Sequence, residues 1–377
     1  MSDLDRLLPL WQELRDAGTE FVLATVVHVE GSGYRKPGAR MLVAADGRKA
    51  GTISGGCLEG EVARKAFWRT ENGPVLRRIS THTEDGEVPF GMGCGGVIHL
   101  LLERSSTASP LLEKLAQAFS ERKSLSIATV IEGTDICKRT YIQQGAQSRV
   151  DDLVSGELQM FAQHGYDDHK SFSADSLLQG NQAVRVWIEF RKARPGLFVF
   201  GAGDDAIPLV RQARQIGWHV TVADGRSNLV TGARFPDADE LLILLPGEIP
   251  YLDIRPTDAA AVMTHSLVQD TRIVPALLKQ TLAYIGILGP RHRTQELLAT
   301  IAGQESILNS QIKSQVSQWM SRIHAPMGLD LGGDTPPEIA LAAIAEIQRA
   351  LHRASGKSLR ELVVQNKELT VGAVSQR

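Results

Sequence analysis

The chain has 377 residues, of which 43% are hydrophobic and 22% are charged, and its formal net charge is −2. Because domains cluster at roughly 100 to 200 residues, this length favours two domains, and the composition is that of a soluble protein. No run approaches the roughly 18 continuous apolar residues of a membrane span, and the near-neutral charge gives no global attraction to nucleic acid or to anionic lipid. We therefore expect neither a membrane nor a nucleic acid among its partners.

The first residues, "MSDLDRLLPLWQEL", are acidic where a secretory signal is basic and contain no long apolar region, which predicts a cytoplasmic protein. The same segment predicts a helix from Asp3 to Asp16, in which Pro9 marks either a kink or a later start. Gly18 follows as a stop signal. The apolar residues on one face of this helix are Leu4, Leu7, Leu8, Trp11 and Leu14.

Short strands and helices follow and predict a mixed α+β domain over residues 1–190. Strand character is found at 21–29, 40–45 and 49–54, and again in "PVLRRIS" and "GGVIHLLLE". Helical composition is found in "LEGEVARKAFW" and from Ser109, a capping residue followed by proline, to Lys123. Residues 143–181 are polar and poorly periodic, so we expect a loop or peripheral hairpins there before the alternating strand "AVRVWIEF".

The charged segment "RKARPG" at 191–196 predicts a domain boundary, because proline and glycine interrupt it. Beyond it, "GLFVFGAGDDAIPLVRQARQIG" and "WHVTVAD" form a strand–turn–helix–strand unit. The segments "DELLILL", "AAVMTH" and "LAYIGILG" predict three further parallel strands, since each is nearly continuous in apolar residues. We expect a Rossmann-like, doubly wound parallel sheet over residues 195–353, with a closing helix capped at Thr335, and a partly disordered tail over residues 354–377.

The turn after the first of these strands carries G-x-G-x-x-A, beginning with Gly201 and Gly203, and Asp224 ends the second strand. In a dinucleotide-binding domain such glycines let a diphosphate approach the helix N-terminus, and the acid takes a ribose hydroxyl. Asp204 and Asp205 lie in the same turn and would repel a diphosphate unless they are turned away or offset by cations. Two interpretations of this turn therefore stay open: it binds NAD(P), or it is a tight turn that only packs the helix on the strand.

Two further strand ends carry candidate ligand contacts, His265 in "VMTHSLVQD" and Arg291 in "GILGPRHR". Because ligands of open parallel sheets bind at the carboxyl ends of strands, these residues would line the same crevice as the glycine turn. Arg291 and Arg293 could hold a phosphate in bidentate fashion. The alternative is that each residue only orders its own loop.

The three cysteines, Cys57, Cys94 and Cys137, show no C-x-x-C spacing, which fits neither a disulfide framework nor a structural zinc site. Cys57 follows Gly55 and Gly56 at the start of a predicted helix, where exposed amides lower the pKa of a thiol and make it a nucleophile or a soft ligand. With the preceding serine, the two glycines could also form an anion-accepting nest. The competing interpretation is a small buried cysteine packed where a larger residue would not fit.

Positive charge concentrates around Cys57. Between Gly31 and Ser80 there are ten basic side chains, Arg35 and Arg40 among them, and four acidic ones. A solvated surface explains many such runs, whereas an anionic small-molecule ligand is the more specific hypothesis.

Several longer motifs occur in order along the chain: "GSGYRKPGARMLV", "GTISGGCLEGEV" and "GMGCGGVIHLLLE" in the first half, and "VFGAG", "VADGR", "YIGILGPRHR" and "HAPMGLDLGGDTPPEIALAAIAEI" in the second. In these motifs the chain resembles the XdhC/CoxI family of xanthine dehydrogenase accessory proteins. The resemblance implies a maturation chaperone that holds the molybdenum cofactor while its terminal sulfur ligand is installed. It also implies delivery to a xanthine dehydrogenase-type molybdoenzyme, with a cysteine desulfurase as a further partner and a homodimer as the candidate assembly; turnover of a substrate is not required.

Position by position, Cys57 and Cys94 match the family's glycine-flanked cysteines, and Arg35 and Arg40 match its basic loop. Contact between Cys57 and molybdenum is our hypothesis, since a thiolate suits a soft metal centre. The family commonly has a histidine directly after its G-A-G turn, where this chain has Asp204, so a ligand role of that histidine does not carry over.

Three rival functions remain from the residues alone. The first is an NAD(P)-dependent oxidoreductase that uses the Rossmann-like domain. The second is a sulfur-transfer enzyme with Cys57 as a persulfide carrier, and the third is a scaffold that binds only protein partners.

Overall fold

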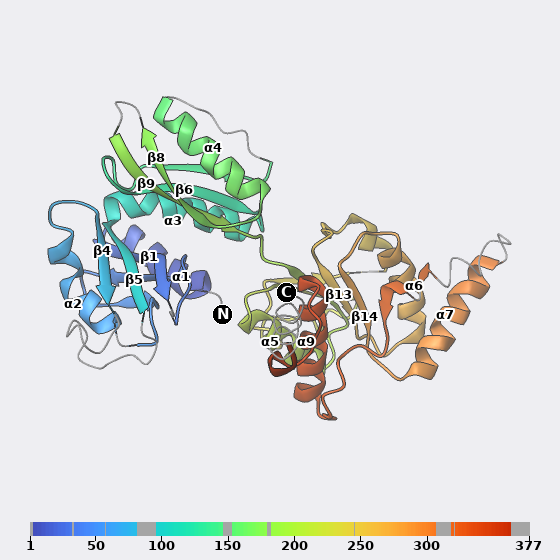
Figure 1. Ribbon diagram of the computed structural model, residues 1–377. Coiled ribbons are helices and arrows are strands. Elements are labelled where there is room, and N and C mark those ends of the chain that lie inside the picture. Colours follow the sequence, from blue (N-terminus) through green and yellow to red (C-terminus); the bar gives the residue numbers. More distant parts are fainter. Residues whose placement is uncertain are drawn as a thin grey trace, which may run out of the picture. The chain divides into compact units, whose positions relative to one another are not determined.

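The computed structural model describes residues 3–31, 34–56, 58–80, 96–145, 153–178, 182–244, 246–306, 318–319 and 321–362. Cys57, Cys94 and most of the predicted tail lie outside these residues. The chain divides into two compact units, unit 1 (Met1–Arg194) and unit 2 (Pro195–Arg377) (Figure 1). Each unit is described by itself.

Unit 1 begins with a five-stranded antiparallel sheet in the order β3-β2-β1-β5-β4. Its strands are β1 (Phe21–Gly31), β2 (Arg40–Ala44), β3 (Lys49–Gly51), β4 (Val75–Ser80) and β5 (Gly96–Arg104). Alternate residues of β1 enter different cores, as the two-residue period of a strand requires. Val22 and Ala24 pack under α2 (Glu59–Arg69), whereas Phe21 and Leu23 pack against α1 (Asp3–Asp16) and α3 (Ser105–Ser120) on the other face.

A second antiparallel sheet of unit 1 has the order β7-β6-β9-β8. Its strands are β6 (Leu125–Glu132), β7 (Arg139–Gln143), β8 (Phe172–Leu178) and β9 (Gln182–Arg191). Helix α4 (Leu153–Asp167) covers one face through Leu158 and Ala162. A small cluster that contains Val27, Leu101 and Trp187 joins this sheet to the first.

Two buried ion pairs also connect the sheets of unit 1. Arg40 on β2 donates from both terminal nitrogens to Glu189 on β9, with Nη1 2.9 Å from Oε1. Arg139 on β7 pairs with Glu103 on β5, with Nη2 2.6 Å from Oε1. All four side chains are at most 5% exposed, so each charge depends on its partner for compensation.

Helix α1 confirms the predicted segment, and Pro9 lies inside it. Two predictions for the rest of unit 1 are wrong. Helix α3 begins at Ser105 and not at Ser109, because β5 runs directly into it and Ala108 is already buried in the core. Residues 153–167 form helix α4 and not a loop. The few apolar side chains of this segment stabilise a helix because they are buried against the second sheet.

Unit 2 is a six-stranded parallel sheet in the order β12-β11-β10-β13-β14-β15, which confirms the Rossmann-like fold. Its strands are β10 (Gly196–Phe200), β11 (His219–Asp224), β12 (Glu240–Ile243), β13 (Ala259–Val262), β14 (Tyr284–Ile287) and β15 (Ile323–His324). Alternation along β10 separates two cores: Leu197 and Val199 face α5 (Ala206–Gln215) and α9 (Pro336–His352). Phe198 and Phe200 face α6 (Leu267–Leu278) and α7 (Arg291–Ser306).

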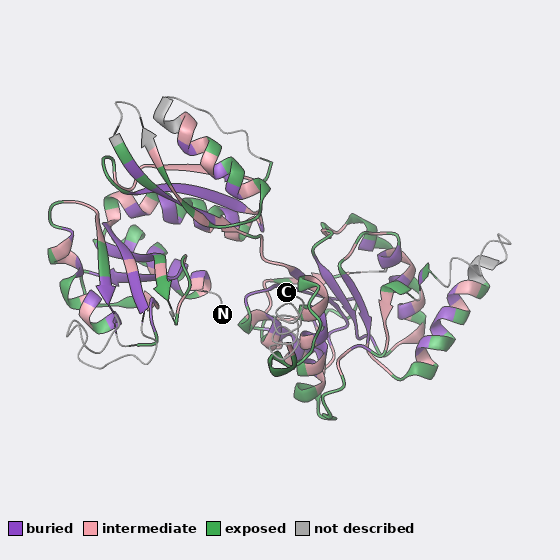
Figure 2. Ribbon diagram, in the orientation of Figure 1, coloured by how far each residue is buried: buried purple, intermediate pink, exposed green. Residues whose placement is uncertain are grey.

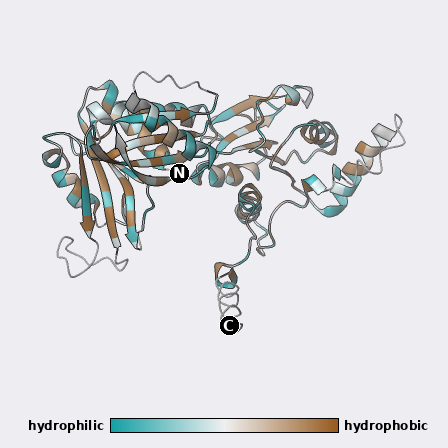
Figure 3. Cartoon of the chain, turned by 45° about the horizontal axis from the view of Figure 1, so that its top comes forward, coloured by the Kyte–Doolittle hydropathy of each residue, from teal (hydrophilic) through white to brown (hydrophobic). Residues whose placement is uncertain are grey.

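The central strands are the most deeply buried parts of both units (Figure 2), and hydrophobic residues concentrate along them (Figure 3). Strand β12 differs from the prediction of a strand buried on both faces: it lies at the sheet edge, and Ile243 is 63% exposed. The predicted capping box at the start of α9 is present, with Thr335 and Glu338 bonded reciprocally. Within the described ranges, no helix has both the length and the apolar character needed to cross a membrane.

Candidate functional site

The crevice of unit 2 lies where the strand order reverses, between β10 and β13, the point at which such sheets bind ligands. Gly201 directly follows β10 and has a φ of +114°, and a Cβ at this position would lie 2.4 Å from the carbonyl oxygen of Met263 after β13. A side chain would therefore push the two strand ends apart. Glycine is required here for backbone packing, whether or not a ligand binds.

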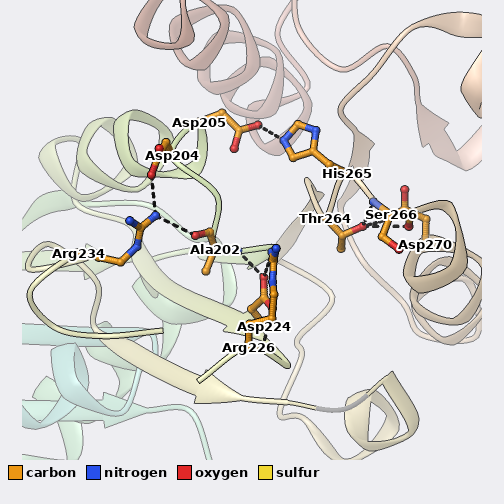
Figure 4. Close-up of polar contacts among 10 residues, drawn as sticks. All are labelled: Ala202, Asp204, Asp205, Asp224, Arg226, Arg234, Thr264, His265, Ser266 and Asp270. Atoms are coloured by element: carbon orange, nitrogen blue, oxygen red, sulfur yellow. Dashed lines mark hydrogen bonds and ion pairs between the residues drawn. The ribbon is translucent and has the colours of Figure 1, made fainter. Parts of the chain in front are cut away.

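The carboxylate of Asp224, at the end of β11, is hydrogen-bonded within unit 2. Its carboxylate accepts hydrogen bonds from the backbone amide of Ala202, at 2.8 Å, and from the backbone and guanidinium of Arg226 (Figure 4). Burial would raise the pKa of Asp224, but the hydrogen bonds from Arg226 and Ala202 outweigh it and lower the pKa. Both oxygens have donors already, so the ribose contact of a dinucleotide would have to displace Arg226.

The two aspartates of the glycine turn point to different partners (Figure 4). Asp204 forms an exposed ion pair with Arg234, at 2.7 Å. Asp205 lies 2.7 Å from Nε2 of His265, which follows β13 and has a φ of +56°. The Asp205–His265 contact therefore joins the loops on either side of the point where the strand order reverses.

Arg293 forms an ion pair within unit 2. Its Nη2 lies 2.6 Å from the buried carboxylate of Asp270, which also accepts from the Thr264 hydroxyl. Burial raises the pKa of Asp270 above its ordinary value, although Thr264 and Arg293 act in the opposite direction. Arg291 is exposed at the first residue of α7, so the two arginines have different surroundings, and their joint binding of a phosphate stays a prediction.

A pocket of about 210 Å³ lies in this crevice. Gly201, Asp224 and Thr264 line it together with the exposed Arg272 of α6. The structure thus brings Gly201 and Asp224 of the predicted set to one pocket, while His265 and Arg291 are not among its lining residues.

The glycine loop of unit 1, residues 52–56, is organised by a carboxylate that sequence reasoning missed. Glu59, in the first turn of α2, accepts from the backbone amides of Ile53 and Ser54, at 3.1 and 2.8 Å, and from the hydroxyls of Thr52 and Ser54. The Ser54 hydroxyl oxygen in turn accepts from the amides of Gly56 and Leu58. The amides of Ser54 and Gly56, two of the three expected in an anion-accepting nest, thus already have acceptors within the protein.

We expect Glu59→Gln to remove part of the acid sensitivity of unit 1. Burial would raise the pKa of Glu59, but hydrogen bonds from Ser54 and Thr52 lower it from an ordinary 4.5 to about 2. A depressed pKa stabilises the fold above pH 4.5 and loses that contribution as the pH falls towards 2. Urea denaturation across this range should show a smaller loss for the variant than for the wild type.

The matched control for this measurement is Glu71→Gln, because Glu71 is exposed beyond the end of α2. It should follow the wild-type pH dependence. An unchanged pH dependence in Glu59→Gln would show that the carboxylate does not hold the loop.

The basic loop, residues 34–39, joins β1 to β2 and lies beside the glycine loop. Gly38 has a φ of +96°, and a Cβ there would lie 3.1 Å from Oε1 of Glu189. Tyr34 is 69% exposed, and its ring carbons lie 3.6 to 3.7 Å from the Cβ position of Gly55. The basic loop and the glycine loop are therefore neighbours at Tyr34 and Gly55.

The predicted arginines of this region have different surroundings. Arg35 is partly exposed and pairs with Asp3 at the start of α1. Arg40 is buried against Glu189, so its guanidinium joins the two sheets. Gly55 and Gly56 belong to the glycine loop, whereas Cys57 and Cys94 lie outside the described residues. Within those residues, no cluster of three or more His, Cys, Asp or Glu side chains is arranged to hold a metal ion.

The fold is that of a two-domain α/β protein, with antiparallel sheets in unit 1 and a Rossmann-like parallel sheet in unit 2. Comparisons with known proteins identify the family. The model described as the XdhC Rossmann domain matches residues 197–347, and that of the XdhC and CoxI family matches residues 14–80. A Bacillus subtilis relative, which is named as a probable subunit of xanthine dehydrogenase, is 31% identical over 340 residues, which cover 89% of this chain and 94% of that protein. This chain belongs to the XdhC and CoxI family.

A solved structure and a second relative agree with this assignment. The crystal structure described as that of a xanthine dehydrogenase from Bacillus halodurans has 29% sequence identity and a TM-score of 0.68, with 95% of this chain and 98% of that chain covered. The Escherichia coli protein named molybdenum cofactor insertion chaperone PaoD is 33% identical over 120 residues, which are 29% of this chain and 34% of that protein.

Proposed function

We propose that this protein is an accessory chaperone of a xanthine dehydrogenase-type molybdoenzyme: it binds the molybdenum cofactor, keeps it while the terminal sulfur ligand is installed, and delivers it. The observation that carries the proposal is the proximity of the basic loop and the glycine loop at Tyr34 and Gly55. An exposed aromatic ring and cationic side chains thus lie near the chain segment that leads to Cys57.

The residues of the two loops fit the chemistry of such a cofactor. The aromatic ring of the cofactor's pterin is flat, which suits the exposed face of Tyr34, and the phosphate of the cofactor suits cations such as Arg35. When bound, the cofactor would supply a soft metal centre, for which a cysteine thiolate is a suitable ligand. Arg40 would not contact the cofactor. Its buried guanidinium pairs with Glu189 and donates to the carbonyl of Gly38, and these bonds hold the basic loop in place.

The names of the relatives support the same role. PaoD is named as a molybdenum cofactor insertion chaperone, and the Bacillus subtilis relative, which is matched over nearly its whole length, is named as part of a probable xanthine dehydrogenase. A chaperone that serves a xanthine dehydrogenase-type enzyme is consistent with both names.

The decisive experiment is anaerobic purification of the full chain from cells that make the cofactor, followed by molybdenum analysis and pterin fluorescence. We expect the wild type to retain both and Cys57→Ala to lose most of both. Cys137→Ala is the matched control: Cys137 is the free cysteine within the described part of the chain, and burial beside Glu103 raises the pKa of its thiol. Equal retention by wild type and Cys57→Ala would remove Cys57 from the site, and no retention by either would contradict the function.

The role in sulfuration is tested separately with a cysteine desulfurase. If Cys57 carries sulfur on the way to the cofactor, incubation with the desulfurase and cysteine should add the mass of one sulfur atom to Cys57. Cys137, whose thiol has a raised pKa, should stay unmodified. A sulfur adduct without cofactor retention would favour a sulfur-transfer enzyme over a chaperone.

The geometry favours the chaperone over an NAD(P)-dependent oxidoreductase. Asp224, the residue that would bind the ribose, already accepts hydrogen bonds from Ala202 and Arg226.

A further inference from the structure

A pocket of about 470 Å³ opens in unit 1 between the basic loop and the end of β9. We call it the basic pocket and define it by its charged lining residues, Asp3, Arg35, Lys36, Glu189, Arg191 and Lys192. Tyr34 and Gly38 also line it. Because the ring of Tyr34 lies beside Gly55, the pocket is close to the glycine loop.

Charge pairing leaves the basic pocket positive. Arg35 pairs with Asp3, and Glu189 is shared between Arg191, at 3.1 Å, and the buried Arg40. With Arg40 included, five cations face two carboxylates. Among the described residues, the side chains of Lys36 and Lys192 have no recorded hydrogen bond or ion pair, and both residues are exposed. These two ammonium groups are thus available to an incoming anion.

The composition of the lining selects among anions. Lys36 comes from the loop between β1 and β2, and Lys192 follows β9, so the two lysines stand on different elements of one pocket. Two ammonium groups and two partly exposed guanidinium groups offer more charge and more donors than a single carboxylate can use, whereas a phosphate monoester carries nearly two charges and three acceptor oxygens at neutral pH. The exposed ring of Tyr34 adds a surface for a flat ring system attached to the phosphate.

We propose that the basic pocket is a binding site for the phosphate monoester of a planar heterocycle, with Lys36 and Lys192 as the residues that hold the phosphate and Tyr34 as the surface for the ring. The inference deepens the proposed function, on which it rests for the identity of the heterocycle as a pterin. Arg191 and Lys192 stand outside both family-matched segments, 14–80 and 197–347.

Isothermal titration calorimetry of the full chain tests the pocket with guanosine 5′-monophosphate, guanosine and inorganic phosphate as probes. We expect the monophosphate to bind more tightly than either fragment, and its binding to weaken with added salt, since the site is open to solvent. The double variant Lys36→Ala/Lys192→Ala should bind it roughly tenfold more weakly, because charge-assisted hydrogen bonds to the phosphate are lost. Tyr34→Ser should weaken the monophosphate but leave inorganic phosphate unchanged.

Two controls locate the binding. Lys114→Ala removes an exposed lysine from α3, away from the pocket, and should change nothing. Arg272→Ala alters the pocket of unit 2 and should also change nothing. Loss of binding in Arg272→Ala with full binding in the lysine variant would overturn the assignment, because the nucleotide would then occupy the Rossmann crevice. No binding of the monophosphate to the wild type would overturn it as well.

Cofactor retention separates the two proposals. If the wild type retains molybdenum and pterin while Lys36→Ala/Lys192→Ala retains them equally well, the pocket assignment fails and the proposed function stands. If the monophosphate binds through the lysines but purified protein retains no cofactor, the phosphate site stands and the proposed function fails.

Discussion

Glu189→Ala should lower the free energy of unfolding of unit 1 by about 3–5 kcal/mol, the cost of leaving one partner of a buried ion pair without compensation. The variant removes the acceptor of both terminal nitrogens of Arg40, whose side chain is 2% exposed. Burial alone would raise the pKa of Glu189, but Arg40 and Arg191 lower it, so the native carboxyl is ionised. Urea denaturation followed by tryptophan fluorescence reports the change, since Trp187 lies 6.0 Å from the Arg40 guanidinium.

A double variant distinguishes ion-pair loss from loss of packing. Glu189→Ala/Arg40→Met also removes the stranded cation, and it should be more stable than Glu189→Ala alone. If the double variant were the less stable of the two, the electrostatic explanation would be wrong. The pair would then contribute through the contacts of its side-chain stems.

Gly201→Ala should be comparably damaging to unit 2, with a loss of about 2–5 kcal/mol from backbone strain and overpacking together. The new Cβ would stand 2.4 Å from the carbonyl oxygen and 2.6 Å from the carbonyl carbon of Met263, and 2.9 Å from Cα of Thr264. All three atoms belong to backbone, so no side-chain rotation relieves the clash. The left-handed φ of +114° adds a penalty that glycine avoids.

The matched control is Gly232→Ala in the same unit, where a Cβ would meet no atom within 4 Å and φ is not in the left-handed region. It should leave the thermal midpoint of unit 2 nearly unchanged. A Gly201→Ala protein as stable as this control would mean that β10 and β13 separate without penalty. The glycine of this turn would then serve ligand binding rather than packing.

Much of unit 2 could be predicted from the sequence because its signals are local. A strand buried on both faces is a continuous apolar run, as in Gly196–Phe200, and the turn after it must be glycine. The capping box at Thr335 likewise lies within four residues. Helix α4 was missed for the opposite reason: its stability depends on a sheet whose strands come before and after it in the chain.

The basic surplus of residues 31–80 shows where a local count fails. Several of its cations pair with acids outside that window: Arg35 with Asp3, Arg40 with Glu189, and Arg78 with Glu30. Only the fold reveals which charges are left for a ligand, and it adds Arg191 at the end of β9 and Lys192 directly after it. The role of Glu59 was equally hidden, because one acid at the start of a helix does not indicate which amides it will accept.

The Arg40–Glu189 pair holds one side of the basic pocket in place without a ligand, since Glu189 lines the pocket and Gly38 lies against it. A pre-organised pocket loses little conformational entropy when a ligand binds. Under the proposed function, a few solvent-facing charges would hold the cofactor. Transfer to a recipient with a deeper site would then need neither an opening of this protein nor an input of chemical energy.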